Sequence, residues 1–148
     1  MCFCKSVAGT LYVEDRVDGS SRGSVYLTGS GSISSPITSS VTWPSPVQRL
    51  ILNDDVEVAV QTSLTVSKLG GDGTGALTVE SNTLTINGMD NDVLGSRCTI
   101  EIQEGATLDT TAVTNFKVTS NEASTSLDIY GTMNAAKVSM EANGTYIF

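Results

Sequence analysis

The stretch Cys98–Phe148 reads CTIEIQEGATLDTTAVTNFKVTSNEASTSLDIYGTMNAAKVSMEANGTYIF, and it decides the fold. Apolar and polar residues alternate in its short runs TIEI, FKV, LDI and VSM. Alternation with a period of two residues is typical of a β-strand that buries one face. Small polar residues and glycine separate the runs, as they do in turns. We therefore predict a series of short strands joined by turns.

The same pattern recurs throughout residues 47–148. Its main strand cores begin at Leu50, Leu77, Ile100 and Leu127, so each start lies a similar distance along the chain from the one before. A spacing in the twenties, with two or three strands in each period, is typical of a β-solenoid or parallel β-helix. A single turn cannot bury its apolar face, so the turns must stack around one hydrophobic column. We predict an all-β fold with a short β-solenoid of about four turns; the alternative is an antiparallel β-sandwich or jelly roll.

The composition agrees with an all-β fold and narrows the choice of partners. Serine and threonine number 19 each among 148 residues, and no window shows a sustained helical stripe of apolar residues. The formal net charge of −8 argues against a nucleic-acid-binding protein, which needs a basic surface. No apolar run approaches the roughly 20 residues that cross a bilayer. We expect neither nucleic acid nor a membrane as a partner.

Two segments precede the predicted solenoid. Residues 1–27 contain strand-like pieces at Leu11–Val13 and Val25–Leu27, which predict a β-hairpin with a long loop. Residues 28–46 are rich in serine, threonine and proline, which predicts an extended arm or linker. The sequence thus divides into a hairpin region, an arm and a solenoid domain at 47–148.

The apolar residues of the arm and of the C-terminus are candidates for binding a partner. Trp43 is the only tryptophan, and this residue type is enriched at binding hot spots. The last solenoid turn exposes open strand edges unless another chain covers them. We therefore expect a homo-oligomer, either a dimer or a trimer. The candidate contact residues are Ile33, Ile37, Trp43, Tyr146 and Phe148.

The residues offer little for catalysis. The chain contains no histidine, so a Ser-His or Cys-His nucleophile cannot form within it. Paired carboxylates can hydrolyse glycosides, but turn chemistry explains most of the pairs in this sequence better. We expect no enzymatic activity and no catalytic residue. The acidic pairs considered are Asp54 with Asp55, Asp90 with Asp92, and Glu101 with Glu104.

Metal and cofactor motifs are incomplete. Cys2 and Cys4 lack the two further ligands that a zinc site needs. Asp90, Asp92 and the GGDGTG segment at 70–75 offer oxygen ligands for calcium but complete no known loop. We expect no metal site and no cofactor, and leave calcium binding by these two turns open.

The stretch TIEIQEGATLDTTAV…SLDIYGTMNAAKVSMEANGTYIF resembles turns of the β-solenoids in phage tail spikes, virion decoration proteins and autotransporter adhesins. The resemblance covers about the C-terminal two-thirds of the chain and rests on the repeated pattern. Adhesins are exported, whereas the N-terminus MCFCKSVAGTLYVEDR does not read as a secretory leader. Virion proteins are made in the host cytoplasm and need no leader.

The resemblance therefore implies a structural virion protein. The function we expect is that of a capsid decoration, or cement, protein, which binds a major capsid protein and stabilises the capsid. The alternative is a carbohydrate-binding or adhesive module of a tail fibre or cell surface. Tyr130 and Tyr146 are the candidate glycan contacts for that alternative.

Overall fold

In a computed structural model the chain is all-β and forms a β-solenoid, so the predicted fold class is confirmed. The described residues are 3–5, 10–16, 22–28, 31–32, 37–39, 43, 46–53, 56–71, 75–89, 99–120, 126–142 and 145–147. They contain sixteen strands and no helix. Within this part of the chain, no helix is therefore present that could cross a membrane.

The largest sheet, sheet A, has eight strands in the order β1-β2-β3-β5-β7-β9-β11-β14. The first three strands pair antiparallel, and every later pair is parallel. The strands are β1 (Phe3–Lys5), β2 (Thr10–Arg16), β3 (Arg22–Thr28), β5 (Val47–Asn53), β7 (Leu64–Gly71), β9 (Thr83–Ile86), β11 (Thr107–Thr110) and β14 (Thr132–Ala135).

Two further sheets complete the coil, and all their strands are parallel. Sheet B has the order β16-β13-β10-β8-β6-β4, and sheet C pairs β12 with β15. The strands of sheet B are β4 (Gly31–Ser32), β6 (Val56–Val60), β8 (Ala76–Val79), β10 (Thr99–Ile102), β13 (Ser126–Ile129) and β16 (Thr145–Ile147). Those of sheet C are β12 (Phe116–Ser120) and β15 (Val138–Ala142).

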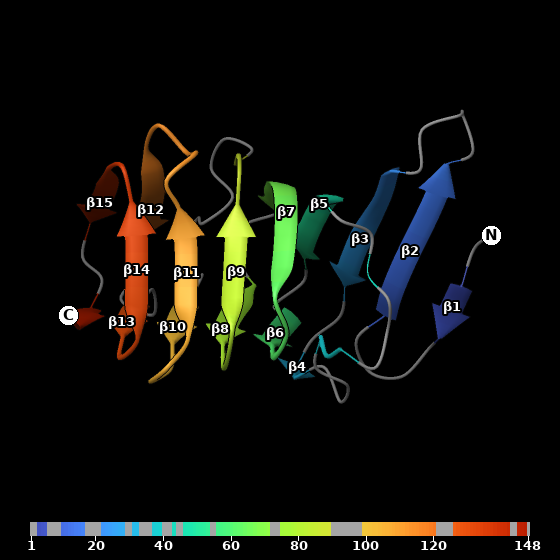
Figure 1. Ribbon diagram of the computed structural model, residues 1–148, viewed down its shortest axis with the longest axis horizontal. Helices are drawn as coiled ribbons and strands as arrows, with labels where there is room; N and C mark the ends of the chain where they lie inside the picture. The colour runs from blue at the N-terminus through green and yellow to red at the C-terminus, as the bar shows by residue number, and fades with distance from the viewer. Residues whose placement is uncertain are drawn as a thin grey trace.

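The chain passes from one sheet to the next and advances by one strand at each circuit. From β6 to β13 it completes about three turns, close to the four expected. The strands of sheet A follow one another along the long axis, with β12 and β15 behind the last of them (Figure 1). This arrangement gives a rod whose sides are sheets and whose ends are strand edges.

The repeat predicted from the sequence is correct for three of its four starting residues. Leu77, Ile100 and Leu127 are direct neighbours in sheet B. Leu50 does not belong to that column, because β5 lies in sheet A and Leu50 pairs with Leu69. The residue that precedes Leu77 in sheet B is Val58, since the early turns are shorter than the later ones.

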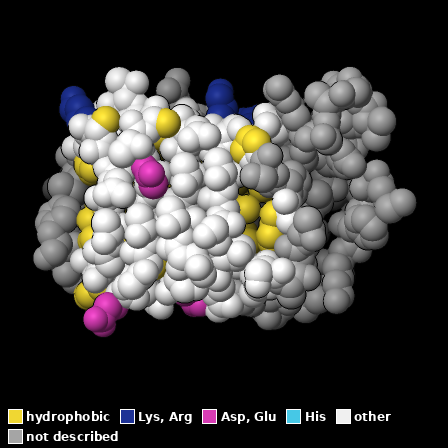
Figure 2. Space-filling model, in the orientation of Figure 1, with side chains coloured by type: hydrophobic (Ala, Val, Ile, Leu, Met, Phe, Trp, Pro, Cys, Tyr) yellow, Lys and Arg dark blue, Asp and Glu magenta, His cyan; other side chains and the backbone are white. Residues whose placement is uncertain are grey.

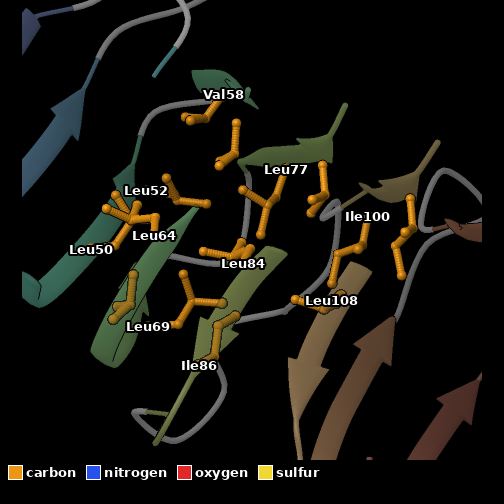
Figure 3. Packing of buried hydrophobic residues seen from close by; sticks show 14 of the residues in the cluster. Leu50, Leu52, Val58, Leu64, Leu69, Leu77, Leu84, Ile86, Ile100 and Leu108 are labelled. Atoms are coloured by element: carbon orange, nitrogen blue, oxygen red, sulfur yellow. The ribbon is translucent and has the colours of Figure 1, made fainter. Parts of the chain in front are cut away.

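The inward residues of sheets A and B form one continuous hydrophobic column. In β8, β9, β10 and β11 every second residue is buried, as alternation predicts. Leucines and isoleucines from both sheets point toward one another inside the coil (Figure 3). Full burial stabilises each of these side chains by about 1.5–3 kcal/mol. The fully buried leucines and isoleucines of the column include Leu69, Leu77, Leu84, Ile86, Ile100, Ile102, Leu108 and Leu127.

Parts of the predicted arm lie against the solenoid. Strand β4 pairs with β6, and Ile37 forms a bridge with Val60. The Ile37 side chain is 3% exposed and belongs to the hydrophobic core. The connection at residues 17–21 lies outside the described residues, so the hairpin remains a prediction, as do the domain boundaries.

Three residues at the corners between sheets B and A meet backbone requirements that few residue types can satisfy. Asn82 and Gly105 have positive φ angles of 64° and 81°. At Gly131 an added Cβ would lie 2.3 Å from the carbonyl oxygen of Gln103 and 2.5 Å from that of Ala106. A Cβ at Gly105 would meet no atom within 4 Å. Gly131 thus allows a close approach between successive turns, whereas Gly105 supplies only a left-handed conformation.

These two glycines provide a matched test of the stacking. We expect Gly131→Ala to destabilise the fold more than Gly105→Ala, because two backbone oxygens must move to admit the methyl group. For Gly105→Ala the left-handed conformation costs about 1–2 kcal/mol. Urea unfolding followed by circular dichroism measures both, and equal losses of stability would contradict the close contact between turns.

Candidate functional site

The outer side of sheet A carries two rows of polar residues, all of which are uncharged except one aspartate. Neighbouring strands lie about 4.8 Å apart, and alternate residues on one strand about 6.7 Å apart, so the rows form a regular array. One row is Thr83, Thr107 and Thr132, and the other is Thr65, Thr85, Asp109 and Asn134. We call these seven residues the threonine face. Strands β7, β9, β11 and β14 lie at the front of the molecule, and charged side chains are sparse over them (Figure 2).

Asp109 is the one charged residue of the threonine face, and it is fixed by the turn that follows β11. Its Oδ1 accepts hydrogen bonds from the backbone N–H of Thr111 at 3.0 Å and from the Thr111 hydroxyl at 2.8 Å. The backbone hydrogen bond lowers the pKa of Asp109, and the hydroxyl bond lowers it further. The carboxylate is therefore directed toward its own turn.

A separate row of residues, outside the threonine face, follows the corner between sheets B and A. The backbone N–H groups of Glu80, Gln103 and Tyr130 each donate to a carbonyl of the preceding turn, at 2.8–2.9 Å. We call Gln61, Glu80, Gln103 and Tyr130 the corner ridge. The Gln61 amide donates to the Glu80 carboxylate. Tyr130 is 56% exposed and is the only large hydrophobic residue among the described ones that is exposed.

The outer side of sheet B brings two carboxylates together. Glu101 and Asp128 lie one full turn apart in the sequence but are neighbours in register on β10 and β13. Asp128 Oδ2 accepts a hydrogen bond from the Ser126 hydroxyl at 3.2 Å, whereas its Oδ1 is buried without a hydrogen-bond partner. Like charges directly opposite each other on a sheet are unfavourable. Glu104, which was considered together with Glu101, does not belong to this pair because it lies in the turn after β10.

The predicted partner-binding residues have different environments. Ile37 is buried in the core of this chain, and Trp43 packs partly buried against that core. The Trp43 indole N–H donates to the carbonyl of Thr38 at 3.0 Å. Tyr146 lies in β16, opposite Leu127, although its side chain is outside the described part. Ile33 and Phe148 also fall outside it. The structure therefore leaves their binding roles as predictions.

The candidate metal and acidic turns fall mostly on residues that the structure does not describe. These are Cys2, Asp54, Asp55, Asp90, Asp92 and the segment 72–74. Where side chains are described, no three cysteine, aspartate or glutamate residues gather as a metal site.

The sequence reasoning missed the threonine face and the Glu101–Asp128 pair. A signal for the first was present in the Thr-x-Thr pattern of TLTI at 83–86 and in the related TLDT at 107–110. Predicting the carboxylate pair required the number of residues between β10 and β13, which the alternation of apolar and polar residues does not give. Searches of protein-family models, curated proteins and solved structures found no match to this chain.

The depressed pKa of Asp109 predicts a stability that depends on pH. Because the folded-state pKa lies below the unfolded value of about 3.9, this contribution is full above that value and disappears as pH falls through the folded-state pKa. We expect the acid-induced loss of stability below about pH 4 to be smaller in Asp109→Asn than in the unchanged chain. Urea midpoints measured from neutral to acid pH test this, and parallel curves for the two proteins would refute it.

Proposed function

We propose that this chain is a structural, non-enzymatic virion protein that binds a major capsid protein and decorates the capsid surface. The observation that carries the proposal is the rod itself, with one buried column and a threonine face that is uncharged except at Asp109. A surface of this kind is suited to contact another protein over a wide area. The resemblance to solenoids of virion proteins points in the same direction.

The threonine face is the surface we assign to the capsid contact. The backbone of its residues is held by the parallel ladder, so little backbone entropy is lost on docking. Threonine offers both a methyl group and a hydroxyl, and its uncharged array avoids the desolvation of buried charges. Among the seven residues of the face only Asp109 is charged, and its carboxylate is held by its own turn. These features favour an interface at sheet A over one at sheet B, where Glu101 and Asp128 lie together.

A direct test is sedimentation of the purified chain with capsids from cells in which it is produced. The chain should pellet with the particles and saturate them. The double substitution Thr83→Lys and Thr107→Lys should weaken binding by about tenfold or more, because each lysine buries a charge without a partner.

Thr78→Lys is the matched control, since Thr78 occupies an outward position of β8 on sheet B with a similar partial burial. It should bind as the unchanged chain does. Absence of the chain from capsid pellets would contradict the decoration role. Equal weakening by Thr78→Lys would contradict the choice of face.

Tyr130 favours a second function, binding of a carbohydrate. An exposed tyrosine ring offers an apolar face for a sugar ring and a hydroxyl for a hydrogen bond. Gln103, in the same ridge, donates from its amide to Glu101 at 3.4 Å, so amide and carboxylate groups lie within one turn of the ring. The carboxylates of Glu80 and Glu101 would repel an anionic polymer, which favours a neutral glycan.

A glycan array of neutral and acidic oligosaccharides tests this second function. We expect binding to neutral glycans that is lost in Tyr130→Ala and kept in Tyr130→Phe, since the phenylalanine retains the ring. Binding that survives Tyr130→Ala would place the site elsewhere, and no binding to any glycan would exclude this function in favour of the first.

A further inference from the structure

The threonine face repeats along the rod, so its uncharged residues alone cannot fix the position of a docked protein. Its strands are parallel and in register, and each presents small polar side chains outward. Neighbouring strands lie about 4.8 Å apart. A partner that moves by one strand therefore meets nearly the same small polar groups. The outward pairs on β9, β11 and β14 are Thr83 with Thr85, Thr107 with Asp109, and Thr132 with Asn134.

Asp109 interrupts this repeat in the interior of the face. Its neighbours in register are Thr85 on β9 and Asn134 on β14, so an uncharged residue lies on each side of it. The side chain of Asn134 has nearly the shape of an aspartate but carries no charge. Charge, rather than size or shape, therefore distinguishes Asp109 from the equivalent position one turn later.

Only one of the two carboxylate oxygens of Asp109 is used by the fold. Oδ1 accepts hydrogen bonds from the Thr111 N–H at 3.0 Å and from the Thr111 hydroxyl at 2.8 Å. These two bonds fill the acceptor sites of that oxygen and fix the orientation of the group. In the part of the chain that the structure describes, Oδ2 accepts no hydrogen bond, and it is not among the buried atoms that lack a partner. Oδ2 is thus a fixed, accessible acceptor in the middle of the face.

The turn after β11 does not need the negative charge. An asparagine at this position offers the same Oδ1 acceptor to Thr111, and asparagine is as suitable as aspartate in such turns. The charge has a consequence only when a partner covers the face. Burying a carboxylate without a counter-charge is far more costly than burying a neutral polar group. A partner that docks over Asp109 must therefore bring a cation to it.

We propose that Asp109 fixes the register of the capsid contact, because its Oδ2 accepts a hydrogen bond from a lysine or arginine side chain of the capsid protein. The inference rests on the proposed function and adds the chemistry of the partner. A hydrogen bond between an ionised donor and an ionised acceptor is stronger than a neutral one. A shift by one strand places the cation opposite Thr85 or Asn134, where it has no counter-charge. One charge thus selects one position on a repeating surface.

Sedimentation with capsids at increasing salt concentration compares Asp109→Asn with the unchanged chain. The substitution keeps the Oδ1 acceptor for Thr111, so the turn is retained. We expect binding to weaken by about tenfold or more and to depend less on salt, because the screened attraction between charges is gone. Asp128→Asn is the matched control, since it removes one carboxylate from the outer side of sheet B. It should bind as the unchanged chain does.

The outcomes separate this inference from the decoration role. Thermal unfolding establishes that both variants fold. If the unchanged chain binds capsids and Asp109→Asn binds equally well, the role of Asp109 is refuted and the decoration role stands. Equal weakening by Asp128→Asn would trace the effect to net charge and would also refute it. A chain that does not pellet with capsids at all would overturn both proposals.

Moving the carboxylate tests the assignment of register. Thr85→Asp combined with Asp109→Asn shifts the charge by one strand and keeps the net charge of the chain. Because the outward residues of neighbouring strands are similar, the capsid protein can follow the charge. We expect part of the affinity lost in Asp109→Asn to return, together with the dependence on salt. Absence of any recovery would show that the two positions are not interchangeable and would contradict the register argument.

Discussion

Parallel pairing in register between successive turns is the constraint on which the rest of this molecule depends. Each strand places its apolar residues above those of the preceding turn, as Leu64, Leu84 and Leu108 do in sheet A. A slip by one residue would turn every inward side chain outward, so burial of the column fixes the register. The close approach at Gly131 shows how tightly the corners follow the same stacking.

The outer surface is a consequence of the same register. Because inward residues stack, the residues between them must also stack, and rows of like side chains result. On sheet A the row Thr83, Thr107 and Thr132 is a hydroxyl array. On sheet B the same rule brings Glu101 beside Asp128, an unfavourable pair that the column enforces. The residues of the outer surface and those of the core thus follow one and the same alternating pattern.

Alternation, together with the spacing of the strand cores, predicted an all-β solenoid, with an antiparallel sandwich or jelly roll as the alternative, and predicted the stacking of Leu77, Ile100 and Leu127. It could not assign Leu50, because a buried apolar run looks the same in either sheet and the turn lengths vary. For Ile37 the pattern indicated an isolated apolar residue in a polar segment, but it could not show that the side chain packs on its own domain. The candidate surfaces were harder still to predict from the sequence. Which residues of successive turns become neighbours depends on the number of residues between the strands. Only the Thr-x-Thr spacing of β9 was visible as a local signal.

The unequal lengths of the turns have a consequence for how such a chain changes over time. The sequence interval between successive inward residues of sheet B grows at every step from Val58 through Leu77 and Ile100 to Leu127, yet these residues remain direct neighbours. The extra residues are accommodated between strands, so strand geometry is uncoupled from loop length. Loop-closure entropy rises only slowly with length, which makes longer connections inexpensive. Segments between the strands can therefore diversify, or carry a grafted peptide, while the framework that displays them stays the same.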